Sequence, residues 1–295
     1  MFGILNLHKP AGWTSRDVVN RVQSLVRPAK VGHAGTLDPL ATGVLVVAVG
    51  PATRLISYVQ QMPKEYRATF LLGRTSPSED TESELTELQT ANVPTLADIE
   101  TCLPKFVGNI RQRPPAYSAL KVQGRRAYQL ARQGYEVKLA PRTIQIFALA
   151  INRYVYPELD LAIRCGSGTY VRSLGRDLAE SLSTGAVMSK LTRTAIGPYL
   201  DVDAVDVEQL QSGSLEEQLL APLTAVSHLP QAILSAAQAS EIRHGRVVAI
   251  SDVKDLQDAQ AEVVAATNPE GRLVALLRRR QAGTLGPLCN FVSPA

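Results

Sequence analysis

The chain has 295 residues, 45% of them hydrophobic, which suffices for one large domain with a buried core and a second small one. Its apolar runs are too short to span a bilayer and its N-terminus lacks the regions of a signal peptide, so we expect a cytoplasmic protein with no membrane contact. Three cysteines without a CxxC pair and four scattered histidines exclude a disulfide framework and predict no metal site.

The net charge of +4 is distributed unevenly along the chain. Residues 101–200 hold 15 basic and 5 acidic residues, residues 201–270 hold 3 basic and 12 acidic, and residues 271–295 hold 4 basic and no acidic residues. A basic middle beside an acidic segment indicates a surface that meets a polyanion on one side. A mixed, solvated surface is the alternative, and the charge counts do not decide between the two.

The first expected elements are a strand, a helix and a second strand. Residues 3–9 form a short apolar run that predicts a strand. A helix follows, with Thr14 or Ser15 as its N-cap and apolar residues at helical spacing until Pro28. Residues 44–49 are a β-branched apolar run, which predicts a buried strand.

A glycine-rich loop just before that buried strand holds a single carboxylate, Asp38. A lone acid in such a loop can reach a substrate from a rigid base. Asp-Pro is also a common turn opener, so a purely structural turn remains an alternative. The loop lacks the Gly-Lys-Ser/Thr ending of a phosphate loop and the acid of a dinucleotide fold, so we expect no cofactor.

Further strands and helices follow. Residues 66–73 alternate as a strand, residues 79–89 read as an exposed acidic loop or hairpin, and residues 94–103 predict a short helix capped by Thr95. The segment from Leu161 begins as an alternating strand, turns at a Gly-Ser-Gly and becomes a helix from about Tyr170.

The stretch from residue 111 to 134 interleaves basic residues with two tyrosines, and a helix is expected from Arg125 to Gly134. Arginines with aromatic residues between them suit a surface that contacts phosphates and stacks on bases. A helix with a solvated basic face is the alternative. The predicted RNA-binding cations are Arg111, Arg113, Lys121, Arg125, Arg126 and Arg132.

The composition changes near Leu229, after which short apolar and alternating runs predict a small β domain. We therefore expect two domains, residues 1–228 and residues 229–295.

Several stretches resemble the TruB family of bacterial tRNA pseudouridine-55 synthases, over roughly residues 3–199. They are GILNLHKPAGWTS, GHAGTLDPLATG, RPPAYSALKVQGRRAYQLAR, GTYVRSL and KLTRTAIGPY. The resemblance implies an α+β pseudouridine synthase fold with a large mixed or antiparallel sheet, followed by a PUA-like RNA-binding β domain. It implies an enzyme that isomerises uridine-55 in the tRNA T-loop after flipping the base out.

The resemblance makes Asp38 the catalytic residue and Lys9 a brace of the active-site floor. Isomerisation breaks N1–C1′ and forms C5–C1′. The sequence leaves three roles open for the carboxylate: attack at C6, attack at C1′ or removal of a ribose proton. We expect Arg172 to pair with Asp38 and to lower its pKa. The expected substrate-binding residues are His33, Tyr66, Tyr170 and Leu191.

Two other classes of protein fit parts of the sequence. One is an RNA-binding protein without catalysis, which the presence of Asp38, Tyr66 and Arg172 argues against. The other is a hydrolase of N-glycosidic bonds, which needs a positioned water and a second acid; no second acid is evident in the sequence. We expect tRNA as the partner, no obligate protein partner and a monomer.

Overall fold

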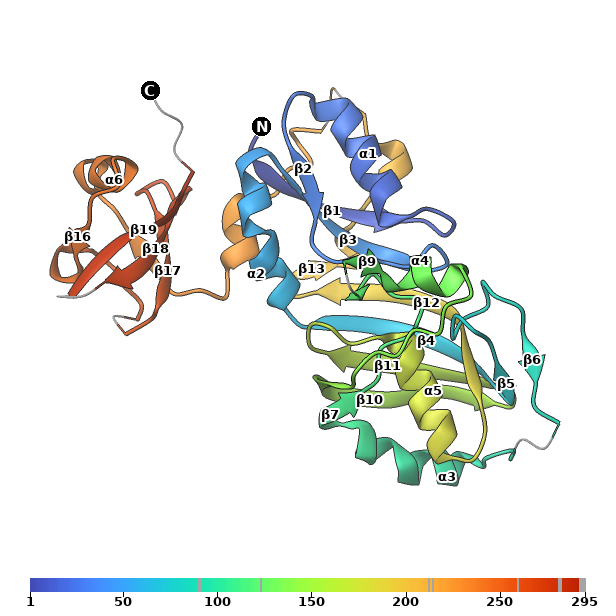
Figure 1. The fold of residues 1–295 in the computed structure, drawn as a ribbon. Coiled ribbons are helices and arrows are strands. Elements are labelled where there is room, and N and C mark those ends of the chain that lie inside the picture. Colours follow the sequence, from blue (N-terminus) through green and yellow to red (C-terminus); the bar gives the residue numbers. More distant parts are fainter. Residues whose placement is uncertain are drawn as a thin grey trace.

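The computed structural model of the chain describes residues 1–89, 92–122, 124–211, 213, 215–258, 260–280 and 283–291. A large body built on one sheet carries a smaller β domain beside its N-terminal strand (Figure 1). The architecture is α+β, as predicted. Among the described residues, no helix is both long and apolar enough to cross a membrane.

The described part of the large body contains a 10-stranded mixed sheet with the strand order β14-β1-β3-β12-β4-β11-β10-β7, to which β13 and β2 are added at β12 and β3. Its strands are β1 (Gly3–Lys9), β2 (Val31–His33), β3 (Thr42–Val49), β4 (Lys64–Leu72), β7 (Gly108–Gln112), β10 (Arg142–Val155), β11 (Glu158–Cys165), β12 (Ala186–Ile196), β13 (Tyr199–Leu200) and β14 (Val205–Asp206). Small two-stranded sheets are formed by β5 (Arg74–Thr75) with β6 (Thr86–Glu87) and by β8 (Lys121–Val122) with β9 (Arg125–Arg126).

The described α-helices are α1 (Ser15–Val26), α2 (Ile56–Gln61), α3 (Leu96–Cys102), α4 (Ala127–Arg132), α5 (Val171–Ser181) and α6 (Ala236–Arg243). The predicted N-caps are confirmed for two of them, because Thr14 and Thr95 each form a capping box. The strands predicted at residues 3–9, 44–49 and 66–73 are also confirmed.

Strand β3 is buried on both faces, which explains its unbroken apolar run. Leu45 and Val47 pack with α1, whereas Val44 and Val46 pack in a second cluster on the opposite face. A strand covered on both sides has no solvent face and needs no polar alternation. The loop that carries Asp38 therefore leads directly into the rigid centre of the body.

Helix α5 packs closely against the antiparallel half of the sheet (Figure 1). A Cβ on Gly175 would lie 2.1 Å from the ring of Phe70 on β4, so only a glycine permits this approach. The close packing fixes the position of the helix, and with it the first turn that carries Arg172.

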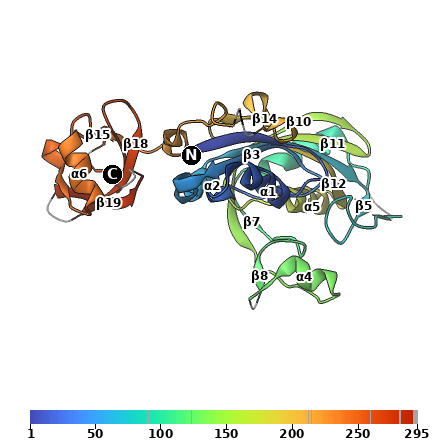
Figure 2. The ribbon, with the colours of Figure 1, turned by 90° about the horizontal axis from the view of Figure 1, so that it is seen from above.

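The connection between β7 and β10, residues 113–141, is here called the arm. Figure 2 shows its strand β8 and helix α4 projecting away from the sheet. The expected helix from Arg125 is wrong at its start, because Arg125 and Arg126 form β9, paired with Lys121 and Val122 of β8. The two arginines favour a helix by propensity, but their pairing in the hairpin overrides it, and the helix begins at Ala127.

The small domain confirms the predicted C-terminal β unit. Its sheet has the order β15-β17-β18-β19-β16, with strands β15 (Gln231–Ile233), β16 (Val248–Ala249), β17 (Val263–Thr267), β18 (Leu273–Arg280) and β19 (Thr284–Asn290). Phe291 stacks on Phe2 with ring centroids 5.2 Å apart, and Arg54 donates to the Asn290 carbonyl at 2.9 Å. These contacts attach the small domain to the N-terminal part of the large body.

Candidate active site

The candidate site lies where the two halves of the large sheet meet. Strands β3 and β12 pair in parallel there, with Thr42 opposite Thr192 and Gly43 opposite Arg193. Gly43 has a φ of +97°, and a Cβ on it would lie 2.3 Å from the Arg193 carbonyl oxygen, so the junction requires glycine. This seam brings the loop before β3 against β12.

A buried arginine holds the loop that carries Asp38. Arg193 is 2% exposed, and it donates from Nε to the Val44 carbonyl at 2.7 Å and from Nη2 to the Gly35 carbonyl at 3.1 Å. Carbonyl groups removed from water need such donors. No role was predicted for Arg193, because a single cation in an alternating strand does not reveal that it points into the core.

A buried lysine holds the same loop from the other side. Lys9 Nζ donates to the carbonyls of Pro10 at 2.8 Å, Trp13 at 2.6 Å and Pro39 at 3.2 Å, which uses all three of its protons. Burial lowers the Lys9 pKa to about 8, although the nearby Asp38 charge opposes the change. Lys9 thus ties the first turn of the chain to Pro39, the residue that follows Asp38.

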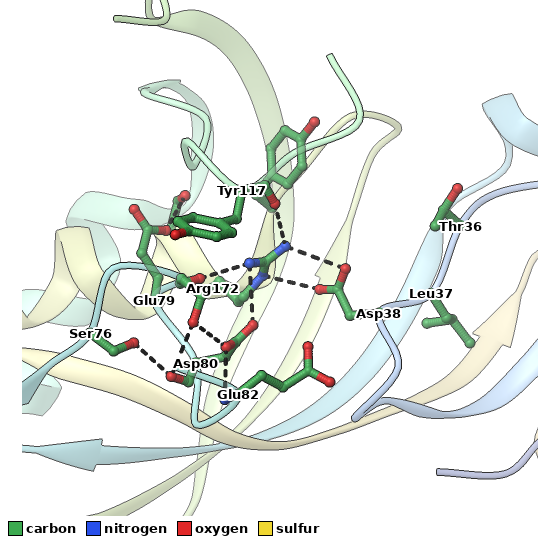
Figure 3. A network of polar contacts seen from close by, with 12 residues as sticks. Thr36, Leu37, Asp38, Ser76, Glu79, Asp80, Glu82, Tyr117 and Arg172 are labelled. Atoms are coloured by element: carbon green, nitrogen blue, oxygen red, sulfur yellow. Dashed lines mark hydrogen bonds and ion pairs between the residues drawn. The ribbon is translucent and has the colours of Figure 1, made fainter. Parts of the chain in front are cut away.

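Helix α5 is anchored at its start by the buried side chain of Gln112 on β7. The Tyr170 amide donates to Gln112 Oε1 at 2.9 Å, and Gln112 Nε2 donates to the Tyr170 carbonyl at 3.0 Å. The first turn of the helix is therefore tied to the base of the arm, and Arg172 points from this turn toward the Asp38 loop (Figure 3).

The predicted ion pair between Arg172 and Asp38 is present. Arg172 Nε lies 3.0 Å from Asp38 Oδ2, and Nη2 lies 3.3 Å from Oδ1, so the guanidinium contacts both carboxylate oxygens. The Asp38 side chain is 32% exposed, whereas that of Arg172 is 7% exposed. The arrangement leaves the carboxylate accessible while its partner is held in the protein.

A second carboxylate shares the same guanidinium (Figure 3). Asp80 Oδ2 lies 3.2 Å from Arg172 Nη1, and its side chain is 2% exposed. Asp80 Oδ1 accepts from Ser78 Oγ at 2.5 Å and from the Glu82 amide at 3.0 Å. Residues 76–82 are here called the acid loop.

The expectation of an exposed segment at residues 79–89 holds for most of residues 81–89 but was wrong for Glu79 and Asp80, which are directed inward. Asp80 also brings a second acid to Arg172, where none was expected. The reason is a long-range contact: Met188 of β12 donates to the Glu79 carbonyl at 3.0 Å, and its carbonyl accepts from the Thr81 amide at 3.1 Å. A polar, acidic composition does not reveal pairing with a strand so distant in the chain.

A cavity of about 220 Å³ opens beside the carboxylate of Asp38. The structure brings five of the predicted site residues together in its lining: Asp38, Tyr66, Tyr170, Arg172 and Leu191. The other lining residues are Thr36, Leu37, Tyr117, Ser118, Ala119, Thr169 and Val171. The cavity therefore combines one accessible carboxylate with aromatic and aliphatic walls, a setting suited to a planar base.

The electrostatics of Asp38 differ from the expectation. Burial raises the pKa of its carboxyl above the usual range, and the nearby Asp80 charge acts in the same direction, whereas Arg172 and Lys9 lower it. The predicted lowering was therefore wrong, because the desolvation of Asp38 outweighs the attraction of its arginine partner. Burial also raises the pKa of Tyr66, which keeps its phenol protonated and able to donate a proton.

His33 is not among the residues that line this cavity. It lies on β2, and burial lowers its pKa, so its imidazole is held neutral. Lys9 is also outside the lining. No group of three histidine, cysteine or acidic side chains within the described ranges is arranged to hold a metal ion.

The predicted RNA-binding cations are all exposed: Arg111, Arg113, Lys121, Arg125, Arg126 and Arg132. The guanidinium of Arg132 lies 5.6 Å from the ring centroid of Tyr128, so the expected cation–aromatic interleaving occurs on α4. The same arm supplies Tyr117 to the cavity, and the Tyr117 carbonyl accepts from Arg172 Nη2 at 3.1 Å. Tyr117 was predicted only as an aromatic residue of the basic stretch, and its place at the site was not foreseen.

The mixed sheet, the seam between β3 and β12 and the cavity beside Asp38 together define a pseudouridine synthase. Comparisons with known proteins give the family. "TruB family pseudouridylate synthase (N terminal domain)" matches residues 23–171, "tRNA pseudouridylate synthase B C-terminal domain" matches residues 172–227, and "tRNA Pseudouridine synthase II, C terminal" matches residues 229–292. The chain belongs to the TruB family of pseudouridylate synthases.

Relatives are similar along most of the chain. A tRNA pseudouridine synthase B of Dehalococcoides mccartyi is 39% identical and aligns over 100% of this chain and 98% of its own length. One from Acaryochloris marina is 44% identical over 79% of this chain and 83% of the relative. Among solved structures, a crystal structure of a Cbf5-Nop10-Gar1 complex matches with a TM-score of 0.74 and 26% identity, covering 99% of this chain and 84% of the other. These similarities confirm the predicted pseudouridine synthase fold.

Proposed function

We propose that this chain isomerises uridine-55 in the T-loop of tRNA to pseudouridine, with Asp38 as the catalytic residue. The observation that carries the proposal is the cavity in which the Asp38 carboxylate, paired with Arg172, faces the side chains of Tyr66, Tyr170 and Leu191. The names of the relatives, which act on tRNA, support the choice of substrate.

The reaction breaks the N1–C1′ bond and forms the C5–C1′ bond, so no atom is gained or lost and no electron acceptor is needed. The cavity must hold the cleaved uracil while it turns. Tyr66 would stack on the base, a type of contact worth about 1–3 kcal/mol, and Tyr170 and Leu191 would close the walls around it. Asp38 would act at C6, at C1′ or at a ribose proton.

The target base must leave its RNA stack before it can enter the cavity, which costs a few kcal/mol. We propose that His33 occupies or stacks at the vacated position, and that the exposed cations of the arm bind the RNA backbone. Arg125 and Arg126 on β9 and Arg132 on α4 support this, since they lie on the projecting part of the arm.

We propose a division into a catalytic unit, residues 1–228, and an RNA-binding unit, residues 229–295. Exposed Arg278 and Arg280 on β18 support RNA binding by the second unit. We further propose that the protein acts on tRNA as a monomer in the cytoplasm without an obligate protein partner. Gel filtration with light scattering, with and without tRNA, tests the monomer.

A hydrolase that releases free uracil would need a second acid to activate water. Asp80 is a candidate for this second acid because it shares Arg172 with Asp38, but it does not line the cavity, and its side chain is 2% exposed. Its oxygens accept from Arg172, from Ser78 Oγ and from the Glu82 amide, so Asp80 is already engaged in holding the protein together. The structure therefore favours isomerisation.

The deciding experiment is incubation of a T-loop RNA with the protein, followed by digestion and nucleoside analysis. Pseudouridine in place of one uridine is the expected result. Free uracil would indicate the hydrolase, and unchanged uridine together with tight RNA binding would indicate a non-catalytic RNA-binding protein. The Asp38→Asn variant is the control, because it keeps the RNA-binding surface and loses the carboxylate.

A further inference from the structure

Helix α5 carries a second arginine, the partly buried Arg176, one helical turn after Arg172. Arg176 Nη1 forms an ion pair with the carboxylate of Glu79, and the two side chains are 12% and 14% exposed. Arg176 Nη2 donates to the Arg113 carbonyl at 2.8 Å, and its Nε donates to Asp177 Oδ1 at 2.9 Å. Arg176 therefore joins three segments: α5, the acid loop and the first residue of the arm.

The contacts of Arg176 repeat those of Arg172. Each arginine pairs with a carboxylate of the acid loop, and each donates to a backbone carbonyl at the root of the arm, here residues 113–117. Only Arg172 also holds Asp38, whereas Arg176 also pairs with Asp177. The fold thus clamps the acid loop and the arm root to α5 twice, and the second clamp does not touch the catalytic carboxylate.

Glu79 is built into this second clamp in an unusual way. Its backbone has a φ of +64°, in the left-handed region that residues with a Cβ rarely adopt. Its carboxylate accepts from Ser173 Oγ at 2.7 Å as well as from Arg176. A conformation of this kind persists only where the surroundings determine it, and here it turns adjacent side chains toward different partners: Glu79 to Arg176 and Asp80 to Arg172.

We propose that Glu79 and Arg176 are positioning residues for the reaction proposed above. Their pair fixes the acid loop and the arm root on α5, so that Arg172 is held between Asp80 and Asp38 with its guanidinium directed at the catalytic carboxylate. Neither residue lines the catalytic cavity; both line a separate recess of about 370 Å³ that also includes Arg113. The pair acts on the reaction through Arg172 and touches no substrate.

The consequence of losing the pair follows from the geometry. Without it, the acid loop would be held to α5 mainly through Arg172, and the arm root would keep the Tyr117 carbonyl as its contact with the arginines. The Arg172 guanidinium would then follow the movements of both segments. Displacement of a catalytic group by about 1 Å lowers rates by up to about 100-fold. The exposed cations Arg125, Arg126 and Arg132 lie on the projecting part of the arm, away from the pair. The rate should fall and RNA affinity should not.

The test measures single-turnover pseudouridine formation at saturating RNA, together with the RNA dissociation constant, for Arg176→Ala and Glu79→Gln. We expect the rate constant to fall between about 10-fold and 100-fold in each variant, with a dissociation constant within about threefold of the wild type. Arg176→Lys should recover part of the rate, because an ammonium can reach Glu79 but cannot also donate to Arg113 and Asp177 in the planar geometry of arginine. The double variant should be no slower than Arg176→Ala, since the two residues act as one unit.

Arg153→Ala is the matched control, because it removes an ion pair with Glu158 at 3.1 Å on the exposed end of β10 and β11. Its rate should equal that of the wild type. A folded Arg176→Ala or Glu79→Gln variant with the wild-type rate, even if less stable, would overturn the inference and reduce the pair to a structural contact. If Arg176→Ala does not fold, Glu79→Gln decides, because it keeps the side-chain size and the contact with Ser173.

The proposal on Glu79 and Arg176 rests on the proposed function, and the two fail differently. A wild-type protein that forms no pseudouridine refutes the proposed function. An active wild type with fully active variants refutes only the role of the pair.

Discussion

Replacement of Arg172 by alanine should destabilise the protein because it leaves carboxylates without a partner. The guanidinium lies 3.0 Å from Asp38 Oδ2 and 3.2 Å from Asp80 Oδ2. Removing one partner of a buried ion pair typically costs about 3–5 kcal/mol. The Asp80 side chain is 2% exposed and should bear this penalty, whereas Asp38 at 32% exposure can regain water. We expect a loss of about 3–5 kcal/mol in the free energy of unfolding, and loss of most activity.

The assay is thermal or denaturant unfolding of Arg172→Ala beside the double variant Arg172→Ala/Asp80→Asn. The second substitution removes the stranded charge, so it should restore part of the stability without restoring activity. A double variant no more stable than Arg172→Ala would refute the explanation by a stranded carboxylate. A single variant with wild-type stability and rate would show that the guanidinium is dispensable.

The destabilisation by Arg172→Ala should also depend on pH. Burial already raises the Asp38 pKa above its unfolded value, and Arg172 opposes this, so removing Arg172 should raise the pKa further. A group whose pKa is raised on folding favours the folded state at low pH and loses this contribution as pH rises through the folded pKa. The stability difference between wild type and variant should therefore be larger at pH 8 than at pH 5. An equal stability difference at pH 5 and pH 8 would contradict the conclusion that Arg172 opposes the rise of the Asp38 pKa.

Three further predictions follow from other parts of the structure. Asp38→Asn should abolish isomerisation while RNA affinity stays within about threefold, and substantial turnover in a pure sample would exclude Asp38 as the catalytic residue. The stability of this variant relative to wild type should increase from pH 4 to pH 7, because the raised pKa of Asp38 makes its ionisation unfavourable in the folded wild type. Arg125→Ala/Arg126→Ala should weaken RNA binding and make the slope of log affinity against log salt concentration shallower by about one unit per lost phosphate contact, with the rate at saturating RNA unchanged. Equal slopes for wild type and variant would show that these residues do not contact the RNA. Lys9→Met should lower both stability and rate by leaving three carbonyls without a donor, and a folded variant with the wild-type rate would show that Lys9 is no brace. The difference in free energy of unfolding between wild type and variant should grow as pH rises above 8. The reason is that burial lowers the Lys9 pKa from 10.5 to about 8, which makes the protonated lysine unfavourable in the folded state at lower pH.

Local patterns in the sequence sufficed for the elements whose burial is regular. The apolar run of β3 predicted a strand because each of its residues is covered, and Thr14 predicted the start of α1 because its side chain satisfies the helix amides directly. Resemblance to a family added the choice of Asp38 among the acids of the chain, which composition alone could not make. Its pairing with Arg172 was expected and is present.

The tertiary structure alone decided how charges are shared at the site. Asp80 looked like part of an exposed acidic loop, and its inward direction depends on backbone bonds to Met188, which is distant in the chain. The direction of the Asp38 pKa shift likewise depends on a balance between desolvation, Arg172 and Asp80 that arises only in three dimensions.

The sequence by itself therefore determined which strands are buried and where the helices are capped, because these depend on neighbouring residues and on the spacing of apolar side chains. The choice of the loop that carries Asp38 needed the resemblance to a family as well. Only the fold decided that Arg172 and Arg176, neighbours on one helix, hold the same acid loop and the same arm root. Such contacts join segments far apart in the chain, and their strength depends on burial, distance and direction, none of which is encoded in local spacing.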